Sequence, residues 1–288
     1  MKQALLFLLL FGFVSVKAQT YKYISVGDGL SDRRVYCIQK DKRRYMWFLT
    51  HEGIDRYNGT EFKQYPLAEN GRTLKTNQHL GWLYVDKDDE IWEIGRSGMV
   101  FKYDEIKDRF QLTFKIPEQK AKYSPFTPIS YSFIDNRQYV WLCGMDEIYL
   151  YHIEKKDTLT MVNVLGEPIT NIAQQDSTHF FIGTEEGVQY AGLTAGGLKL
   201  IPLKGLSEFT VQVNDMYYHP ATRQLFIGTF QKGIYIYNLD EDSCSPPQID
   251  FSEVSVNRIK PFENNDILIA TDGAGIYKIN AVTRKTEP

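Results

Sequence analysis

The sequence lacks several features by which common protein classes are identified. Its 288 residues include only three cysteines and five histidines, and its longest basic cluster is the short run at 40–44. The formal net charge is −3, whereas binding to nucleic-acid phosphates needs a clustered basic face. A dedicated nucleic-acid surface is therefore not expected.

The few cysteines and histidines predict neither a disulfide framework nor a metal site. An odd number of cysteines cannot all pair within one chain. Cys37 and Cys143 lie in apolar, strand-like runs, where a free thiol packs as a small hydrophobe, and Cys244 lies in a stretch that resembles a loop. The histidines lack the spacing of metal ligands. They are His51, His79, His152, His179 and His219. No cofactor is expected.

Enzyme signatures are also missing. The sequence contains no G-x-S-x-G, H-E-x-x-H, P-loop or G-x-G-x-x-G motif. Asp86, Asp88 and Asp89 are spaced like part of a calcium loop. However, Ile91 stands where that loop needs glycine, so a polar turn before Trp92 is the better interpretation. We predict no catalytic and no metal-binding residue, and we expect the chain not to be an enzyme.

Long hydrophobic runs are absent after the first residues. Lys2 is followed by an almost unbroken apolar run at 4–16, and small residues stand at Val16 and Ala18. A basic start, a short apolar run and small residues of this kind predict a secretory signal peptide over residues 1–18. We expect cleavage after Ala18, and a periplasmic or secreted mature chain. An uncleaved N-terminal anchor is the alternative.

What the sequence does contain is a repeat. In each of six segments a large apolar anchor opens a short apolar run, which ends at a small residue and is followed by a turn and a second strand pattern. The anchors recur every 40 to 49 residues, which is the period of a propeller blade. The anchors are Trp47, Trp92, Trp141, Phe181, Phe226 and Leu268.

Each repeat predicts four strands. A short apolar run bounded by turn residues indicates a strand buried on both faces, and glycine supplies the positive φ of a tight hairpin. Five repeats carry that glycine, and Glu147 replaces it in the third. The glycines are Gly53, Gly98, Gly187, Gly233 and Gly275. We therefore predict an all-β propeller of four-stranded blades over 19–288. A β-sandwich would not require this order six times.

The first repeat carries the most specific motif. It contains a Gly-Leu-Ser start, a Val-x-x-Ile strand, an Asp turn, a Trp-containing strand and a Gly-Ile-x-Arg-Tyr-x-Gly hairpin strand. These are Gly29–Ser31, Val35 with Ile38, Asp41, Trp47–Thr50 and Gly53–Gly59. The pattern resembles the first blade of the two-component regulator propeller family. The second, fifth and sixth repeats match it in reduced form, and the third and fourth match it loosely.

The resemblance implies an extracytoplasmic sensor region. In that family two propellers precede a Tyr-rich β-sandwich, a membrane helix and a histidine kinase or DNA-binding output, and many members resemble oligosaccharide sensors. We expect this chain to be the N-terminal part of such a sensor, with a small molecule or oligosaccharide as ligand, a homodimer as a further possibility, and membrane attachment only through regions beyond the chain. The alternative is a free secreted propeller that binds a glycan or a protein. A lyase or glycosidase is a third, weaker option.

The number of blades stays open between six and an incomplete ring of seven. Residues 20–26 have the pattern of a lone outer strand, which would complete the last blade and close a ring of six. The family resemblance instead implies seven blades, with the seventh beyond Pro288.

Ligand-binding residues cannot be assigned from the sequence. Trp82 is the one tryptophan that is not an anchor, and packing within its own blade is preferred over stacking on a ligand. Asn58-Gly59-Thr60 has the form of a glycosylation triplet, and Glu185 and Glu186 form an acidic pair, but both fall in predicted turns. Propeller ligands usually meet loops at one face or at the mouth of the channel.

Overall fold

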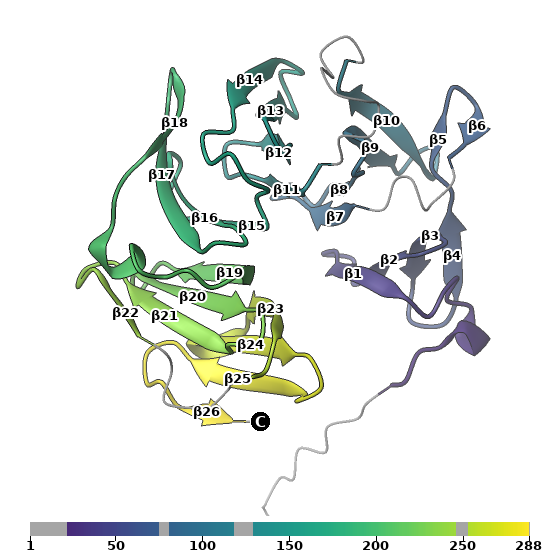
Figure 1. Ribbon diagram of the computed structural model, residues 1–288. Helices are drawn as coiled ribbons and strands as arrows, with labels where there is room; N and C mark the ends of the chain where they lie inside the picture. The colour runs from purple at the N-terminus through teal and green to yellow at the C-terminus, as the bar shows by residue number, and fades with distance from the viewer. Residues whose placement is uncertain (1–21, 75–80, 118–128, 246–252, 288) are drawn as a thin grey trace, which may run out of the picture.

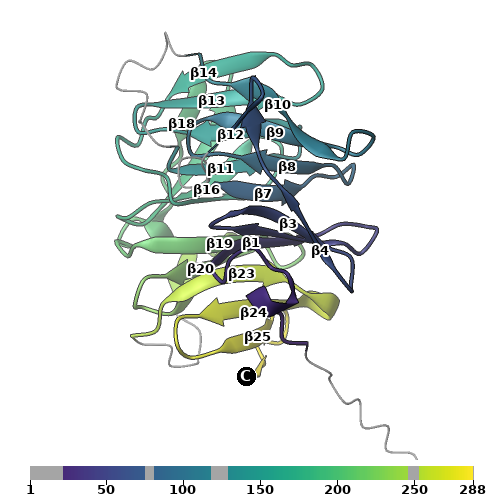
Figure 2. The same ribbon diagram turned by 90° about the vertical axis from the view of Figure 1, so that its right-hand side faces the viewer.

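The computed structural model describes residues 22–74, 81–117, 129–245 and 253–287. Six antiparallel four-stranded sheets surround a common centre, as Figure 1 shows. Seen from the side in Figure 2, inner strands such as β1, β7 and β19 run across the thickness of the ring. The predicted propeller and its six repeats are confirmed. The predicted signal peptide lies outside the described residues.

Each blade consists of four strands in chain order, from the centre to the rim. Blades 1 to 3 contain β1 (Val35–Lys40), β2 (Met46–Thr50), β3 (Gly53–Tyr57), β4 (Phe62–Tyr65); β7 (Trp82–Val85), β8 (Ile91–Ile94), β9 (Met99–Asp104), β10 (Arg109–Lys115); β11 (Tyr131–Ile134), β12 (Tyr139–Cys143), β13 (Glu147–His152) and β14 (Thr158–Val162). A small hairpin, β5 (Ala68–Glu69) with β6 (Arg72–Thr73), lies between blades 1 and 2 in the chain.

Blades 4 to 6 follow the same plan. They contain β15 (Asn171–Gln174), β16 (His179–Gly183), β17 (Val188–Thr194), β18 (Gly197–Leu200); β19 (Val213–His219), β20 (Gln224–Thr229), β21 (Ile234–Asn238), β22 (Ser243–Ser245); β23 (Val256–Pro261), β24 (Asp266–Thr271), β25 (Ile276–Asn280) and β26 (Thr286–Glu287). Cys244 therefore lies in a strand, and its assignment to a loop was wrong. Pairing with Tyr237 of β21 forms this strand despite the serines on either side.

The hairpin glycines have the predicted conformation. All five have a positive φ, between 71° and 136°. At Gly187 a side chain is also excluded by space, because a Cβ would lie 2.1 Å from the carbonyl oxygen of Phe209. In blade 3, Glu147 instead begins β13 and pairs with Val162, so this turn does not require a left-handed residue there.

The anchors make the contacts between blades. Trp47 packs with Leu83 of blade 2, Trp141 packs in the cluster shared with blade 4, and all five anchors from Trp47 to Phe226 are at most 2% exposed. Each of these five faces the next blade along the chain. Leu268, the sixth, is only half-buried and belongs to none of the clusters of the described residues.

The three tryptophan anchors share a polar contact. In each, the indole Nε1 donates a hydrogen bond to an aspartate six residues earlier, at 2.9, 2.8 and 3.0 Å in blades 1 to 3. The aspartates are Asp41, Asp86 and Asp135. Each also accepts backbone N–H groups of its own turn. A buried indole N–H therefore has a partner, and the same carboxylate fixes the turn.

The Gly-Leu-Ser motif covers the face of blade 1 on which no other described blade packs. Leu30 packs with Phe48 and Tyr57, and the Ser31 hydroxyl bonds both Thr50 and Asp55. Residues 22–25 form no strand, and Ile24 packs against blade 1.

The hypothesis that residues 20–26 complete the last blade is therefore wrong for the described part of this segment. The fourth strand of blade 6 is β26, from the other end of the chain. No hydrophobic cluster of the described residues joins blade 6 to blade 1, and Figure 1 shows these two blades apart.

Candidate functional site

The inner strands of the six blades contribute one equivalent residue each to the centre of the propeller. Strand pairing places each of them opposite the residue two positions after the anchor of the same blade. We call them the axial residues. They are Cys37, Trp82, Tyr131, Asn171, Asp215 and Arg258.

Contacts connect five of the axial residues from blade to blade. The rings of Trp82 and Tyr131 meet edge to face with centroids 6.0 Å apart. The Asn171 amide Nδ2 lies 3.2 Å from the Tyr131 hydroxyl and donates to Asp215 Oδ1 at 2.7 Å. Arg258 Nη1 lies 3.7 Å from the same Asp215 oxygen. Side chains from blades 2, 3, 4, 5 and 6 thus form one continuous polar and aromatic chain.

β-Bulges precede three of the axial residues. The strand register shifts immediately before Cys37, Asp215 and Arg258. A bulge bends its strand and changes the direction of the neighbouring side chains. The bulges therefore set the direction in which Asp215 and Arg258 project.

Burial dominates the electrostatics at the axis. Burial raises the pKa of Asp215, and Arg258 and the Ile259 amide, which donates to Oδ2 at 2.7 Å, oppose that rise. Burial and the nearby Asp215 also raise the pKa of Tyr131. Arg258 interacts electrostatically with Asp215, Tyr131, Cys37 and Tyr84. These four residues belong to four different blades, so the guanidinium group lies near the axis.

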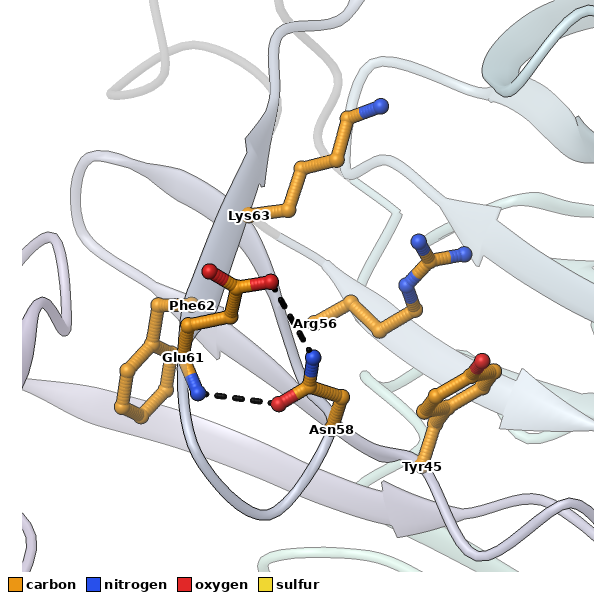
Figure 3. Close-up of a pocket in the computed structure, with 6 residues that line it drawn as sticks. All are labelled: Tyr45, Arg56, Asn58, Glu61, Phe62 and Lys63. Atoms are coloured by element: carbon orange, nitrogen blue, oxygen red, sulfur yellow. Dashed lines mark hydrogen bonds between the residues drawn. The ribbon is translucent and has the colours of Figure 1, made fainter.

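A second candidate is a shallow pocket of about 290 Å³ at the rim of blade 1, shown in Figure 3. Its lining consists of Tyr45, Arg56, Asn58, Glu61, Phe62 and Lys63. Asn58 holds the turn between β3 and β4, because its Oδ1 accepts the backbone N–H groups of Thr60 and Glu61 at 2.9 Å. The turn interpretation of the Asn-Gly-Thr triplet is therefore supported.

The cations of this rim pocket already have partners. The Arg56 guanidinium lies 4.8 Å from the ring centroid of Tyr45 and donates to the Tyr103 hydroxyl at 2.8 Å. Lys63 bonds Asp108, and this bond together with the Tyr103 hydroxyl holds the Asp108 pKa well below its usual range. Arg56 also lies 3.7 Å from Asp108. These contacts connect blades 1 and 2, so the pocket is better explained as part of the packing between these blades than as a binding site.

The residues considered from the sequence lie in separate places. Trp82 packs between blades 2 and 3, with the Arg96 guanidinium 5.3 Å from its ring centroid, and it is also an axial residue. Asp86 organises the turn before Trp92, and the acidic pair at 185–186 lies in the hairpin loop after β16.

The cysteines and the described histidines do not form a site. All three cysteines are free. Within the described ranges no group of three or more His, Cys, Asp and Glu side chains is placed to hold a metal ion. His79 lies outside those ranges.

Sequence reasoning missed Asn171, Asp215 and Arg258 as a group. The signal that marks them is positional, because each axial residue stands ten residues before its anchor, or eleven in blade 5. Their chemistry gives no signal, since all six residue types differ.

No protein-family model matches the sequence, and no curated protein matches it significantly. Solved structures do resemble it. One is the extracellular domain of a protein described as a hybrid two-component system of B. thetaiotaomicron, with a TM-score of 0.71 and 19% identity over 93% of this chain and 37% of that one. The chain has the fold of the matched part of that domain. A second such domain from B. thetaiotaomicron gives a TM-score of 0.67 and 18% identity over 92% of this chain and 33% of its own.

Propellers of other kinds also resemble the chain. Virginiamycin B lyase from Staphylococcus aureus has a TM-score of 0.61 and 13% identity, over 84% of this chain and 78% of the lyase. These identities establish a shared fold and nothing beyond it. The chain spans 37% and 33% of the length of the two B. thetaiotaomicron domains.

Proposed function

We propose that this chain is the extracytoplasmic, ligand-sensing propeller of a two-component-type regulator, and that its ligand is an oligosaccharide. The observation that carries the proposal is the shared fold with extracellular domains of hybrid two-component systems over 93% of the chain. The first repeat, which starts with Gly29–Ser31, supports it, because its motif resembles the first blade of the two-component regulator propeller family. The signal would pass through altered packing or through the geometry of a homodimer.

An extracytoplasmic location is part of the proposal. It rests on the basic and apolar N-terminus with small residues at Val16 and Ala18, and on the extracellular origin of the similar domains. In the described part of the chain, no helix has the length and apolar character of a membrane span.

Binding without turnover is the activity that the axial residues support best. Asp215 is the one carboxylate among them, and its two oxygens already accept hydrogen bonds from Asn171 and Ile259. Glycosidases use a pair of carboxyl groups that flank the scissile bond, and the axial residues provide no such pair. The group suits recognition of a polar ligand by an amide, a hydroxyl and a guanidinium.

Calorimetric titration of the purified chain with neutral and acidic oligosaccharides tests the proposal, with thermal unfolding as a second readout. We expect at least one oligosaccharide to bind, and to raise Tm by roughly 5 °C at a hundredfold excess over its Kd. If none binds, the oligosaccharide sensor is rejected. Release of reducing ends from a polysaccharide would reject the assignment as a non-enzyme.

A free secreted propeller that binds a glycan or a protein is the alternative function. The lyase and a peptide-bound propeller, which are matched over 78% and 80% of their own length, show that propellers of comparable size occur in other roles. The reading frame after the codon for Pro288 separates the two functions. Continuation into a membrane helix and a kinase or DNA-binding region is expected, and a stop codon would favour the secreted propeller.

A further inference from the structure

Asn171 has an acceptor that no described residue uses. Asn171 is only 2% exposed, and its Oδ1 has no hydrogen-bond partner among the described residues. The orientation of the amide is fixed, because Nδ2 must face the acceptor Asp215 Oδ1 at 2.7 Å. A buried acceptor without a donor costs about 1–3 kcal/mol, so an unpaired carbonyl at the axis calls for an explanation.

Arg258 has donors that no described residue uses. Its side chain is 49% exposed, and its nearest carboxylate oxygen, Asp215 Oδ1, lies at 3.7 Å, beyond hydrogen-bond distance. The Asp215 carboxylate cannot turn toward Arg258 without losing the bonds from Asn171 and Ile259. The guanidinium therefore keeps its planar set of N–H donors available beside the axis.

The side chains of Asn171 and Arg258 are neighbours. The Asn171 amide and the Arg258 guanidinium approach the same atom, Asp215 Oδ1. Lys260, two residues after Arg258 on β23, also acts electrostatically on Asp215. Two cations against one carboxylate leave the region around Arg258 positive, which favours an anionic ligand.

We propose that the axial residues bind an acidic sugar, with the carboxylate of a uronic acid on the Arg258 guanidinium. A hydroxyl of the same sugar donates to Asn171 Oδ1 once the side chains that bury this atom in the free protein move aside. A guanidinium binds a planar carboxylate through two parallel hydrogen bonds. Sugar hydroxyls supply the donor that the buried carbonyl lacks. Asp215 acts as a positioning residue, because it orients the amide and leaves the guanidinium unpaired.

This inference deepens the proposed function and rests on it. Its test is calorimetric titration of the purified chain with short oligomers of galacturonate, of mannuronate and of glucuronate-containing sugars, each paired with its carboxyl-reduced form. Sulfated oligosaccharides form a third set. The variants are Arg258→Gln, which removes the charge, and Arg258→Lys, which keeps the charge but lacks the two parallel N–H donors of the guanidinium group. Arg109→Gln, at an exposed arginine on rim strand β10, is the control.

We expect at least one uronate to bind, and its carboxyl-reduced form to bind about 10- to 100-fold more weakly. Arg258→Gln should lower uronate affinity by the same factor without affecting the reduced sugar, Arg258→Lys should fall between, and Arg109→Gln should match the unaltered chain. Thermal unfolding checks that each variant folds.

Three outcomes would overturn the inference. They are tighter binding of neutral sugars than of uronates, a preference for sulfated sugars, and unchanged uronate affinity in Arg258→Gln. If neutral or sulfated oligosaccharides bind best, the uronate site is rejected but the proposed oligosaccharide sensor is not. Failure of every oligosaccharide to bind would remove both.

Discussion

The two ends of the row of blades differ in how their outer faces are covered. On blade 1, Leu30 and Phe48 are 5% and 6% exposed, and the segment before β1 covers them. On blade 6, Ile276 is 64% exposed, and Leu268 is half-buried outside every described cluster. One end face therefore has a hydrophobic cover of its own, and the other has none among the described residues.

The difference follows from the direction of the repeat. Anchors face forward along the chain. Among the described residues, no anchor fills the backward face of blade 1 and no blade packs on the anchor of blade 6. The Gly-Leu-Ser segment fills the backward face of blade 1, where the Asp55 carboxylate accepts both the Ser31 amide and its hydroxyl. We therefore expect stability to depend strongly on interior anchors, less on the blade 1 cover and least on Leu268.

The largest effect is expected from Trp141→Ala. Trp141 is fully buried between blades 3 and 4, and its Nε1 donates to Asp135. Removing a buried aromatic anchor costs about 3–5 kcal/mol, which urea unfolding measures. Trp141→Phe, which keeps the ring and loses the hydrogen bond, should cost less. A loss below about 1 kcal/mol for Trp141→Ala would mean that the blades do not depend on forward-facing anchors.

The next effect is expected from Leu30→Ala, which weakens the cover of blade 1. Leu30 contacts a cluster smaller than those between blades, so the loss should lie near the low end for buried leucine, about 2 kcal/mol. Hydrogen exchange of β1 to β4 should rise more than that of blade 4. Equal exchange in all blades would contradict a cover that acts on blade 1 alone.

An acidic residue on the backward face of blade 2 gives a pH-dependent prediction. Glu93 is fully buried opposite Leu83 and Phe101, and neither carboxyl oxygen has a described partner. Its counterparts in the other blades are apolar, as Phe48 and Ile269 show. Burial raises the pKa of Glu93 well above 4.5, because the charged form loses its hydration.

The sign of this effect is fixed by the raised pKa. The folded protein retains the proton on Glu93 at pH values where the unfolded chain releases it. The contribution of Glu93 to stability is therefore fully present below about pH 4.5 and is lost as the pH rises toward the folded pKa. Glu93→Gln should flatten this fall, and Glu93→Leu should also raise stability at neutral pH by about 1–3 kcal/mol. Urea unfolding from pH 4 to 8 measures both. An identical pH profile in Glu93→Gln would show that another group controls it.

The sequence predicted the blades well and the candidate site poorly, for one physical reason. Strands, anchors and hairpin glycines repeat because every blade packs against its neighbour through the same contacts. Trp47 and Gly53 therefore have close equivalents in most other blades. The axial residues have no packing role that is common to all blades. Asn171, Asp215 and Arg258 occupy equivalent positions with unrelated side chains, so only strand register reveals them as a group.

The two wrong predictions concern segments whose structure depends on a neighbouring strand or blade that the local sequence does not reveal. Residues 20–26 have the composition of a strand, but the described part of the segment packs on blade 1 instead. Cys244 looks like a loop residue between polar neighbours, and pairing with Tyr237 makes it part of β22. In both, tertiary contacts outweighed local propensity.

The smallest effect is expected from Leu268→Ala, which separates the last anchor from the others. Because Leu268 is half-buried and outside every described cluster, truncation removes little apolar surface from contact and should cost less than about 1 kcal/mol. Phe226→Ala is the matched control, since Phe226 is fully buried one blade earlier and should cost about 3–5 kcal/mol. Similar losses for the two variants would mean that the forward face of blade 6 is covered in solution. Sedimentation would then distinguish a second copy of the chain, whose mass doubles, from cover by residues of the same chain.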